Sequence, residues 1–521
     1  MTGTAVRSRG DNRGYWLVPS VLSASTYCRT ATALAVAVCA LSVHAQTPRL
    51  GTVNFPTSGS PAAQSHFITG LLYLHSFEYP SALKEFREAE RIDPAFAMAY
   101  WGEAMTYTHP IWDEQDADAG RAAIAKAPSA RTAREAAYVA AVKALYSSGS
   151  KAHRDTLYSA AMADLAKHYP DDAEAQLFYA LSLLGLSQGD RVIPTYLRAG
   201  AIAETVFAHQ PDHPGAAHYV IHSYDDPQHA AIALKAARAY STIAPDAAHA
   251  QHMTSHIFLA LGLWDDVVTA NETTLHLVHM GHQGGGACGH YPEWLEYGYL
   301  QLGRLASAAE ILDACWTSGG TAGQVVSYAS PAIMRAAYIV DSRDWAGRVA
   351  TEAAKPSGDA LTGLHLLFGT GYAAAMRHDS KTAGSVLSAM DSVIKLDPTF
   401  GATYGRIMRD EVAAAMTSIA DPAREAARMD DSLPMPFGPP VTIKPPHELL
   451  GELLLAEHKP DSAIAEFQLA LARAPRRPMS LLGLAQAQQA AGRSAEAAKT
   501  YATLAEIWHA ADSTIRAQVP K

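Results

Sequence analysis

The sequence from Ala63 to Phe96 reads AQSHFITGLLYLHSFEYPSALKEFREAERIDPAF, and it decides the fold. Gly70 and Ala82 are small residues that let two helices approach closely, and Phe86 supplies an aromatic ring to fill the space between them. Pro94 then ends the second helix, because proline cannot continue a helical hydrogen-bond ladder. This stretch therefore predicts one antiparallel helix hairpin.

The same pattern returns near the C-terminal end of the chain. Lys444–Arg477 and Pro478–Ala511 repeat the small residues of the first hairpin, and the first of them also repeats its aromatic and proline. The spacing resembles that of the tetratricopeptide repeat (TPR) family. The resemblance covers most of residues 63–511 and implies an all-α fold, a right-handed superhelical solenoid of TPR-like antiparallel helix hairpins. Because such arrays serve many roles, it implies little about function.

Composition along the chain predicts its organisation. Arginines precede an apolar stretch, Ala31–Val43, which is too short to span a bilayer and is followed by a small residue, Ala45, suited to signal cleavage. Residues 431–447 are rich in proline, which is typical of an extended linker. We therefore expect a signal peptide at 1–45, an N-terminal linker at 46–62, a TPR-like array carrying a histidine cluster at 63–430, a Pro-rich linker at 431–447, and a C-terminal TPR pair at 448–521.

The predicted signal peptide indicates a periplasmic or secreted protein with no membrane span after cleavage. The formal net charge of −10 argues against nucleic acid or anionic lipid as a partner. Beyond the signal peptide only Cys288 and Cys315 remain, at the two ends of one predicted hairpin. In an oxidising compartment they are placed to form a disulfide, and two separate thiols are the alternative.

Histidines provide the main functional signal. His218 and His222 are four residues apart, His252 and His256 are four residues apart, and the second pair follows the first by 34 residues, the period of a TPR hairpin. Residues four apart lie one above the other on a helix, and equivalent positions of successive hairpins lie side by side. Four imidazoles are therefore expected to face one another across two neighbouring helices.

Hairpin turns set the register of these residues. If Pro214 and Ala248 begin two repeats, the histidine pairs fall at positions 5 and 9, and His249 falls at position 2. In TPR proteins these positions line the concave face, so the resemblance implies a histidine-lined groove. Imidazole is a ligand for Cu, Zn or Fe. The predicted metal ligands are His218, His222, His249, His252 and His256.

Further candidates follow from the same register. Glu293, expected beside His252, and Asp225 are the predicted catalytic proton carriers. His290, His109 and Tyr297 are the predicted ligand-binding residues. Asp225 also has an alternative role, in which it orients an imidazole. Two alternative roles of the histidines stay open: neutral imidazoles that hydrogen-bond an organic ligand, and simple packing.

The sequence supports three function hypotheses. The first is an exported TPR solenoid that binds a transition metal and acts as a metal-dependent enzyme, an oxidase or oxygenase with copper or a hydrolase with zinc. The second is a scaffold that binds a peptide or small molecule in its groove, or a protein partner through its C-terminal TPRs. The third is a periplasmic metal carrier. The stretch from His213 to Phe258 resembles exported bacterial TPR proteins of unassigned activity.

Overall fold

The computed structural model describes residues 47–187, 191–280, 287–319, 325–326, 329–353, 355–356 and 359–520. Residues 48–521 form one compact unit, and the predicted signal peptide at 1–45 lies outside the described residues. Among the described residues, no helix is both long and apolar enough to cross a membrane. Almost all regular structure is helical, so the all-α prediction is confirmed.

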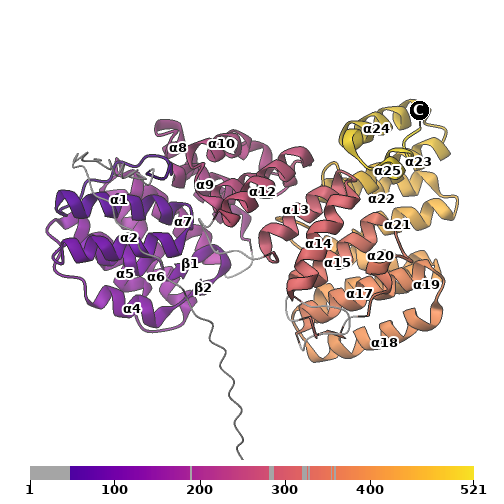
Figure 1. Ribbon diagram of the computed structural model, residues 1–521, viewed down its shortest axis with the longest axis horizontal. Coiled ribbons are helices and arrows are strands. Elements are labelled where there is room, and N and C mark those ends of the chain that lie inside the picture. Colours follow the sequence, from indigo (N-terminus) through magenta and orange to yellow (C-terminus); the bar gives the residue numbers. More distant parts are fainter. Residues whose placement is uncertain are drawn as a thin grey trace, which may run out of the picture. The chain divides into compact units, whose positions relative to one another are not determined.

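The first part of the chain forms twelve helices in succession (Figure 1). They are α1 (Pro61–His75), α2 (Tyr79–Ile92), α3 (Ala97–Met105), α4 (Ala117–Ala125), α5 (Ala133–Leu145), α6 (Lys151–His168), α7 (Ala173–Leu184), α8 (Ile193–His209), α9 (Pro214–Ser223), α10 (Ala230–Ile243), α11 (Ala248–Ala260) and α12 (Trp264–His279). Each packs mainly against its neighbours in sequence, as expected for a hairpin array.

The array continues to the C-terminal end in the same way. Its helices are α13 (His290–Gln301), α14 (Leu305–Gly319), α15 (Ala329–Ser342), α16 (Arg348–Thr351), α17 (Ala360–Met376), α18 (Ser380–Leu396), α19 (Arg406–Thr417), α20 (Ala420–Asp431), α21 (Pro446–Ala456), α22 (Pro460–Arg473), α23 (Pro478–Ala490), α24 (Ser494–Ile507) and α25 (Ser513–Arg516). Short helical turns are η1 (Pro110–Trp112), η2 (Gly185–Ser187), η3 (Gly401–Gly405) and η4 (Trp508–Ala510).

Two small strand pairs interrupt the helices. β1 (Thr108–His109) pairs antiparallel with β2 (Glu114–Gln115), between α3 and α4. β3 (Val325–Val326) pairs parallel with β4 (Lys355–Pro356). A disulfide joins Cys288 to Cys315, as the sequence allowed.

Glycine–aromatic packing explains why the hairpins form. A Cβ on Gly70 would lie 2.9 Å from the ring of Phe86, and a Cβ on Gly102 would come closer still to the same ring. Phe86 of α2 is thus held between α1 and α3, and only glycine leaves room for it. Gly451 and Gly483 enclose Phe467 in the same way. The array of antiparallel helix hairpins predicted from the sequence is confirmed by this repeated contact.

The segment before α1 is packed against the array. The backbone N–H of Thr52 donates to the carbonyl of Asp212 at 3.0 Å, and Arg49 forms an ion pair with Asp246 at 2.8 Å. Leu50 and Phe55 are buried. The described part of the N-terminal linker therefore covers the connections before α9 and α11, the helices that carry most of the histidines.

The C-terminal hairpins contact the turns of earlier hairpins. The indole N–H of Trp264 donates to the carbonyl of Arg476 at 3.0 Å, and that of Trp508 donates to the carbonyl of Gln301 at 3.1 Å. Residues 432–445 connect α20 to α21, and within them Thr442, Ile443 and Lys444 are buried. The last two hairpins therefore belong to the same packed unit.

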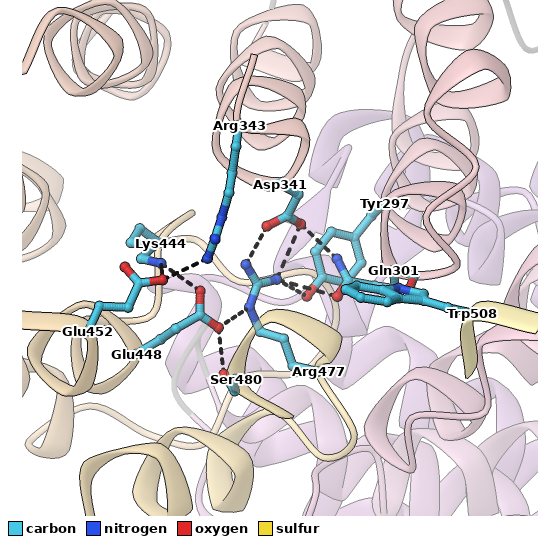
Figure 2. A network of polar contacts seen from close by, with 10 residues as sticks. All are labelled: Tyr297, Gln301, Asp341, Arg343, Lys444, Glu448, Glu452, Arg477, Ser480 and Trp508. Atoms are coloured by element: carbon cyan, nitrogen blue, oxygen red, sulfur yellow. Dashed lines mark hydrogen bonds and ion pairs between the residues drawn. The ribbon is translucent and has the colours of Figure 1, made fainter. Parts of the chain in front are cut away.

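A buried ionic network reinforces this packing (Figure 2). Arg477 pairs with Asp341 of α15 and, at 2.9 Å, with Glu448 of α21. Lys444 donates to Glu448 at 2.8 Å and to Glu452 at 2.9 Å. Two cations thus balance carboxylates that arise from distant parts of the chain.

Candidate metal centre

Six histidines from three helices converge on one region. His218 and His222 lie on α9, His249, His252 and His256 lie on α11, and His290 is the first residue of α13. They form two groups of three, one made by His218, His222 and His249 and the other by His252, His256 and His290. Within each group the ring nitrogens lie within 4.8 Å of one another. The two histidine pairs predicted from the sequence are therefore neighbours, with the rings of His222 and His256 6.0 Å apart, but each pair belongs to a different group.

The first group, called here the first triad, presents bare nitrogen atoms. The Nε2 atoms of His218, His222 and His249 are all buried, and none has a hydrogen-bond partner in the described part of the chain. The Nδ1–H of His218 donates to the carbonyl of His75 at 2.6 Å, which leaves its Nε2 with a free lone pair. A buried polar atom without a partner is costly, so three together point to a missing ligand.

Burial keeps these imidazoles neutral. The pKa of His218 is lowered to about 3, mainly by burial, which outweighs the opposing effect of the hydrogen bond to the His75 carbonyl. The pKa values of His222 and His249 are also lowered well below their ordinary range, first by burial and then by neighbouring histidines. Neutral imidazole is the form that binds a metal ion.

The second group, called here the second triad, is oriented by hydrogen bonds to its outer ring atoms. The Nδ1–H of His252 donates to Oδ1 of Asn271 at 2.7 Å, and that of His256 donates to Oδ2 of Asp225 at 2.5 Å. The amide of Asn271 is itself fixed, because its Nδ2 donates to the carbonyl of Val267 at 2.8 Å. Such partners on the far ring nitrogen are typical of metal-bound histidines.

A third polar group lies behind the first triad and serves as its support. Glu174 accepts from Nε2–H of His75 at 2.7 Å and from Nε2–H of His213 at 2.9 Å. Nδ1 of His213 accepts the backbone N–H of Ala216, and Nδ1 of His75 accepts the hydroxyl of Tyr219 at 2.9 Å. Burial alone would raise the pKa of Glu174, but the two imidazoles hold it well below its usual value. Every ring nitrogen is used here, so this group holds His75 in place rather than binding a metal.

Aromatic rings enclose the two triads. Phe77 lies 4.3 Å from His218, and Trp294 lies 4.2 Å from His256, between ring centroids. Phe77 lies in a hairpin turn and has a left-handed backbone conformation, with φ of 54°. In two other hairpin turns this conformation is taken by glycines, Gly262 and Gly303. A residue with a side chain is strained there, by about 1–3 kcal/mol. The turn between α1 and α2 thus keeps a strained phenylalanine that covers the first triad.

The structure differs from the predicted histidine-lined groove, because another part of the chain covers the histidines. The turn from His75 to Glu78 packs onto α9 and α11, and the backbone N–H of His249 donates to Glu78 at 3.1 Å. As a result His218 and His252 are fully buried, while His290 is exposed at the start of α13. The site is therefore an enclosed centre with an exposed edge at His290.

Two predicted residues lie elsewhere. Glu293, expected beside His252, lies with Glu296 against α15, and burial raises its pKa to about 7. Tyr297 belongs to the ionic network of Arg477 (Figure 2), with its hydroxyl 3.4 Å from a guanidinium nitrogen. The physical reason is that α13 packs against α12, so only its first turns, with His290 and Trp294, reach α11.

The remaining candidates lie close to the triads. Asp225 accepts a hydrogen bond from His256, which fits its alternative predicted role of orienting an imidazole. Its other oxygen, Oδ1, is buried and has no partner among the described residues. His109 stacks on Tyr79 at 3.9 Å and contacts Trp112, whose ring lies 5.8 Å from His249. His109 therefore lies one ring away from the first triad and does not contact it.

Sequence reasoning missed several supporting residues. His75 and His213 are buried, although their positions near hairpin ends suggested exposure, and Asn271 and Trp294 carried no signal. His290, which the sequence predicted as a ligand-binding residue, carried a further signal: His222, His256 and His290 follow one another at intervals of 34 residues.

Comparisons with known proteins add little. No protein-family model matches the sequence, and no curated protein matches it. Among solved structures, the human IFIT1 dimer with m7Gppp-AAAA has a TM-score of 0.33 at 13% identity, covering 87% of this chain and 91% of that one. The P58(IPK) TPR domain has a TM-score of 0.21 at 13% identity (83% and 99% covered), and yeast Tom70 has 0.27 at 10% identity (88% and 87% covered). Likenesses this distant carry no argument about the site.

Proposed function

We propose that this chain is a TPR-like protein that binds a transition metal ion through His218, His222 and His249. The observation that carries the proposal is the convergence of three buried Nε2 atoms that have no partner among the described residues. Three imidazoles leave at least one position of a four-coordinate ion open, which is the arrangement of a catalytic rather than a structural site. The ion is Cu, Zn or Fe, in keeping with an all-nitrogen ligand set.

The surroundings favour a retained metal over a carried one. His218 is fixed by the carbonyl of His75, which is held in turn by Glu174 and Tyr219. Phe77 covers the rings. A ligand set held this rigidly and shielded from water exchanges its ion slowly, so we propose a metal-dependent enzyme, an oxidase or oxygenase with copper or a hydrolase with zinc.

The exposed edge of the site gives the direction of substrate approach. His290 and Trp112 are exposed, and Tyr291 beside them is half-buried. A small molecule with an apolar ring would pack on Trp112 and Tyr291 while a polar group reaches the metal. Asp225, which contacts His256, is the carboxylate that we propose as proton carrier, because its buried Oδ1 has no partner among the described residues.

Metal content tests the proposal directly. The protein, purified without a histidine tag, is expected to contain near-stoichiometric metal, and a His218→Ala/His249→Ala variant is expected to lose the ion of the first triad. His365→Ala is the matched control, because His365 is equally buried, but both its ring nitrogens lie near backbone carbonyls, at 2.7 and 3.1 Å. Absence of metal from the wild-type protein, even after reconstitution, contradicts the proposal.

We also propose that the protein works outside the cytoplasm. The apolar stretch Ala31–Val43 and the Cys288–Cys315 disulfide support this location, because disulfides persist in oxidising compartments. Cell fractionation with N-terminal sequencing tests it: the mature chain is expected to begin at Gln46. A cytoplasmic protein with its N-terminus intact would contradict it.

A further inference from the structure

The two triads share a boundary on α11. The ring centroids of His222 and His256 lie 6.0 Å apart, and those of His249 and His252 lie 6.1 Å apart. His249 belongs to the first triad, whereas His252 and His256 belong to the second. An ion in the second triad would therefore be the direct neighbour of an ion in the first.

The second triad contains a contact that requires a positive charge. Nδ1 of His252 and Nδ1 of His256 both donate to oxygen acceptors, so a ring that carries one proton has its lone pair on Nε2. These two Nε2 atoms lie 3.1 Å apart. Two lone pairs repel at that distance unless a proton or a metal ion lies between them. Two nitrogens bound to one tetrahedral ion at about 2.0–2.1 Å are separated by about 3.3–3.4 Å, which is close to the contact.

His290 supplies the third nitrogen. Its ring centroid lies 4.5 Å from that of His252, and the two aromatic residues that follow it, Tyr291 and Trp294, lie 4.8 and 4.9 Å from the same ring. The start of α13 thus brings a ligand and an apolar wall together. The second triad therefore has the same composition as the first, three imidazoles within 4.8 Å.

Charge decides which metal suits two neighbouring sites. Imidazoles contribute no negative charge, and the carboxylates in contact with the six histidines in the described chain are Asp225 and Glu78. Two divalent ions would leave a large uncompensated charge in a buried region, whereas two copper(I) ions carry half as much. In the divalent state, copper is also the tightest-binding metal of its row for nitrogen ligands.

We infer that His252, His256 and His290 form a second metal site and that the two triads together hold a pair of copper ions. The inference rests on the proposed function, because it requires the first triad to bind metal. It extends that function by assigning a second metal site beside the first and by naming copper as the metal of both. A copper pair can give or take two electrons in one reaction, which a single copper ion cannot.

Copper stoichiometry and electron paramagnetic resonance test the inference on the full-length mature protein. Anaerobic loading with copper(I), followed by desalting, is expected to leave two copper ions per chain in the wild type and in His365→Ala. One ion is expected in His218→Gln/His249→Gln and one in His252→Gln/His290→Gln. Circular dichroism shows whether each variant keeps its helices, and the glutamine variants keep a polar side chain of similar length.

The outcomes separate the two proposals. If the wild type binds one ion, which the first-triad variant loses and the second-triad variant keeps, the copper pair is overturned and the proposed function stays intact. A shared proton then explains the 3.1 Å contact between the two Nε2 atoms. No bound copper or other metal overturns both. After oxidation, a wild type that holds a neighbouring copper pair is expected to show fewer unpaired spins than it has copper ions. Each double variant is expected to show one unpaired spin per copper ion. A full spin count in the wild type, or displacement of both ions by equimolar zinc, also overturns the inference.

Discussion

Replacing Asn271 by leucine separates the metal-orienting role of this residue from its role in packing. Asn271 lies on α12 and is fully buried. Its Oδ1 accepts from His252 at 2.7 Å, and its Nδ2 donates to a carbonyl one turn earlier at 2.8 Å. Leucine has nearly the same shape, so the variant removes the acceptor without opening a cavity. The imidazole of His252 then loses the bond that fixes its tautomer.

The size of the effect follows from two costs. A buried N–H left without an acceptor costs about 1–3 kcal/mol, so the metal-free variant is expected to unfold more easily by about that amount. Loss of the outer hydrogen bond of a metal-bound histidine weakens metal binding about 10–100-fold. This factor corresponds to about 1.4–2.7 kcal/mol of binding free energy.

Two measurements on three proteins check this prediction. Urea unfolding of the metal-free protein gives the first cost, and competition with a copper chelator gives the second. Asn271→Asp is the control, because a carboxylate keeps the acceptor and should keep tight copper binding. If Asn271→Leu binds copper as tightly as the wild type while losing stability, the hydrogen bond serves folding alone and the orientation argument fails.

Three further predictions use other parts of the molecule. Burial lowers the pKa of His218 to about 3, so between pH 3 and about 6.5 the unfolded chain binds a proton at this residue that the folded chain does not. The metal-free protein should therefore lose stability as the pH falls from about 6.5 to 3. Urea midpoints across that range measure the loss, and a flat profile contradicts it. Arg477→Met leaves Asp341 and Glu448 buried without their cation, and thermal unfolding should show a loss of about 3–5 kcal/mol; a loss below about 1 kcal/mol would mean that the network is dispensable. Copper should quench the fluorescence of Trp294, whose ring lies 4.2 Å from His256, and Trp294→Phe should remove that quenching while keeping the copper.

The repeat period explains what the sequence could predict. A 34-residue step brings equivalent positions of successive hairpins side by side, so the amino-acid sequence alone was enough to place His218, His222, His252 and His256 together. The Gly70–Phe86 contact followed in the same way from the spacing of small and aromatic residues. Local register was enough wherever neighbours in the array are also neighbours in sequence.

Contacts outside the repeat period could not be predicted. The turn from His75 to Glu78 covers the site from more than 130 residues away, as shown by the bond between His75 and His218. The connection before α13 is longer than the one between α10 and α11, so the register that placed Glu293 beside His252 did not hold there. In both cases the packing of distant segments, rather than helix periodicity, decides which side chains meet.

Repeat positions 5 and 9 carry buried polar residues in several hairpins of this array. The glutamates at these positions on α21 differ from the histidines on α9 and α11 in a way that supports the metal proposal. With Lys444 as position 1, Glu448 and Glu452 occupy positions 5 and 9, the positions of the histidine pairs on α9 and α11. The carboxylates receive Lys444 and Arg477, so their charge is balanced within the protein (Figure 2). The Nε2 atoms of the first triad have no such partner among the described residues, and one ring nitrogen of each histidine lies within 4.8 Å of those of the other two. The fold satisfies these positions internally where it supplies its own cations, and the bare nitrogens on α9 and α11 are in keeping with the metal ion that we propose.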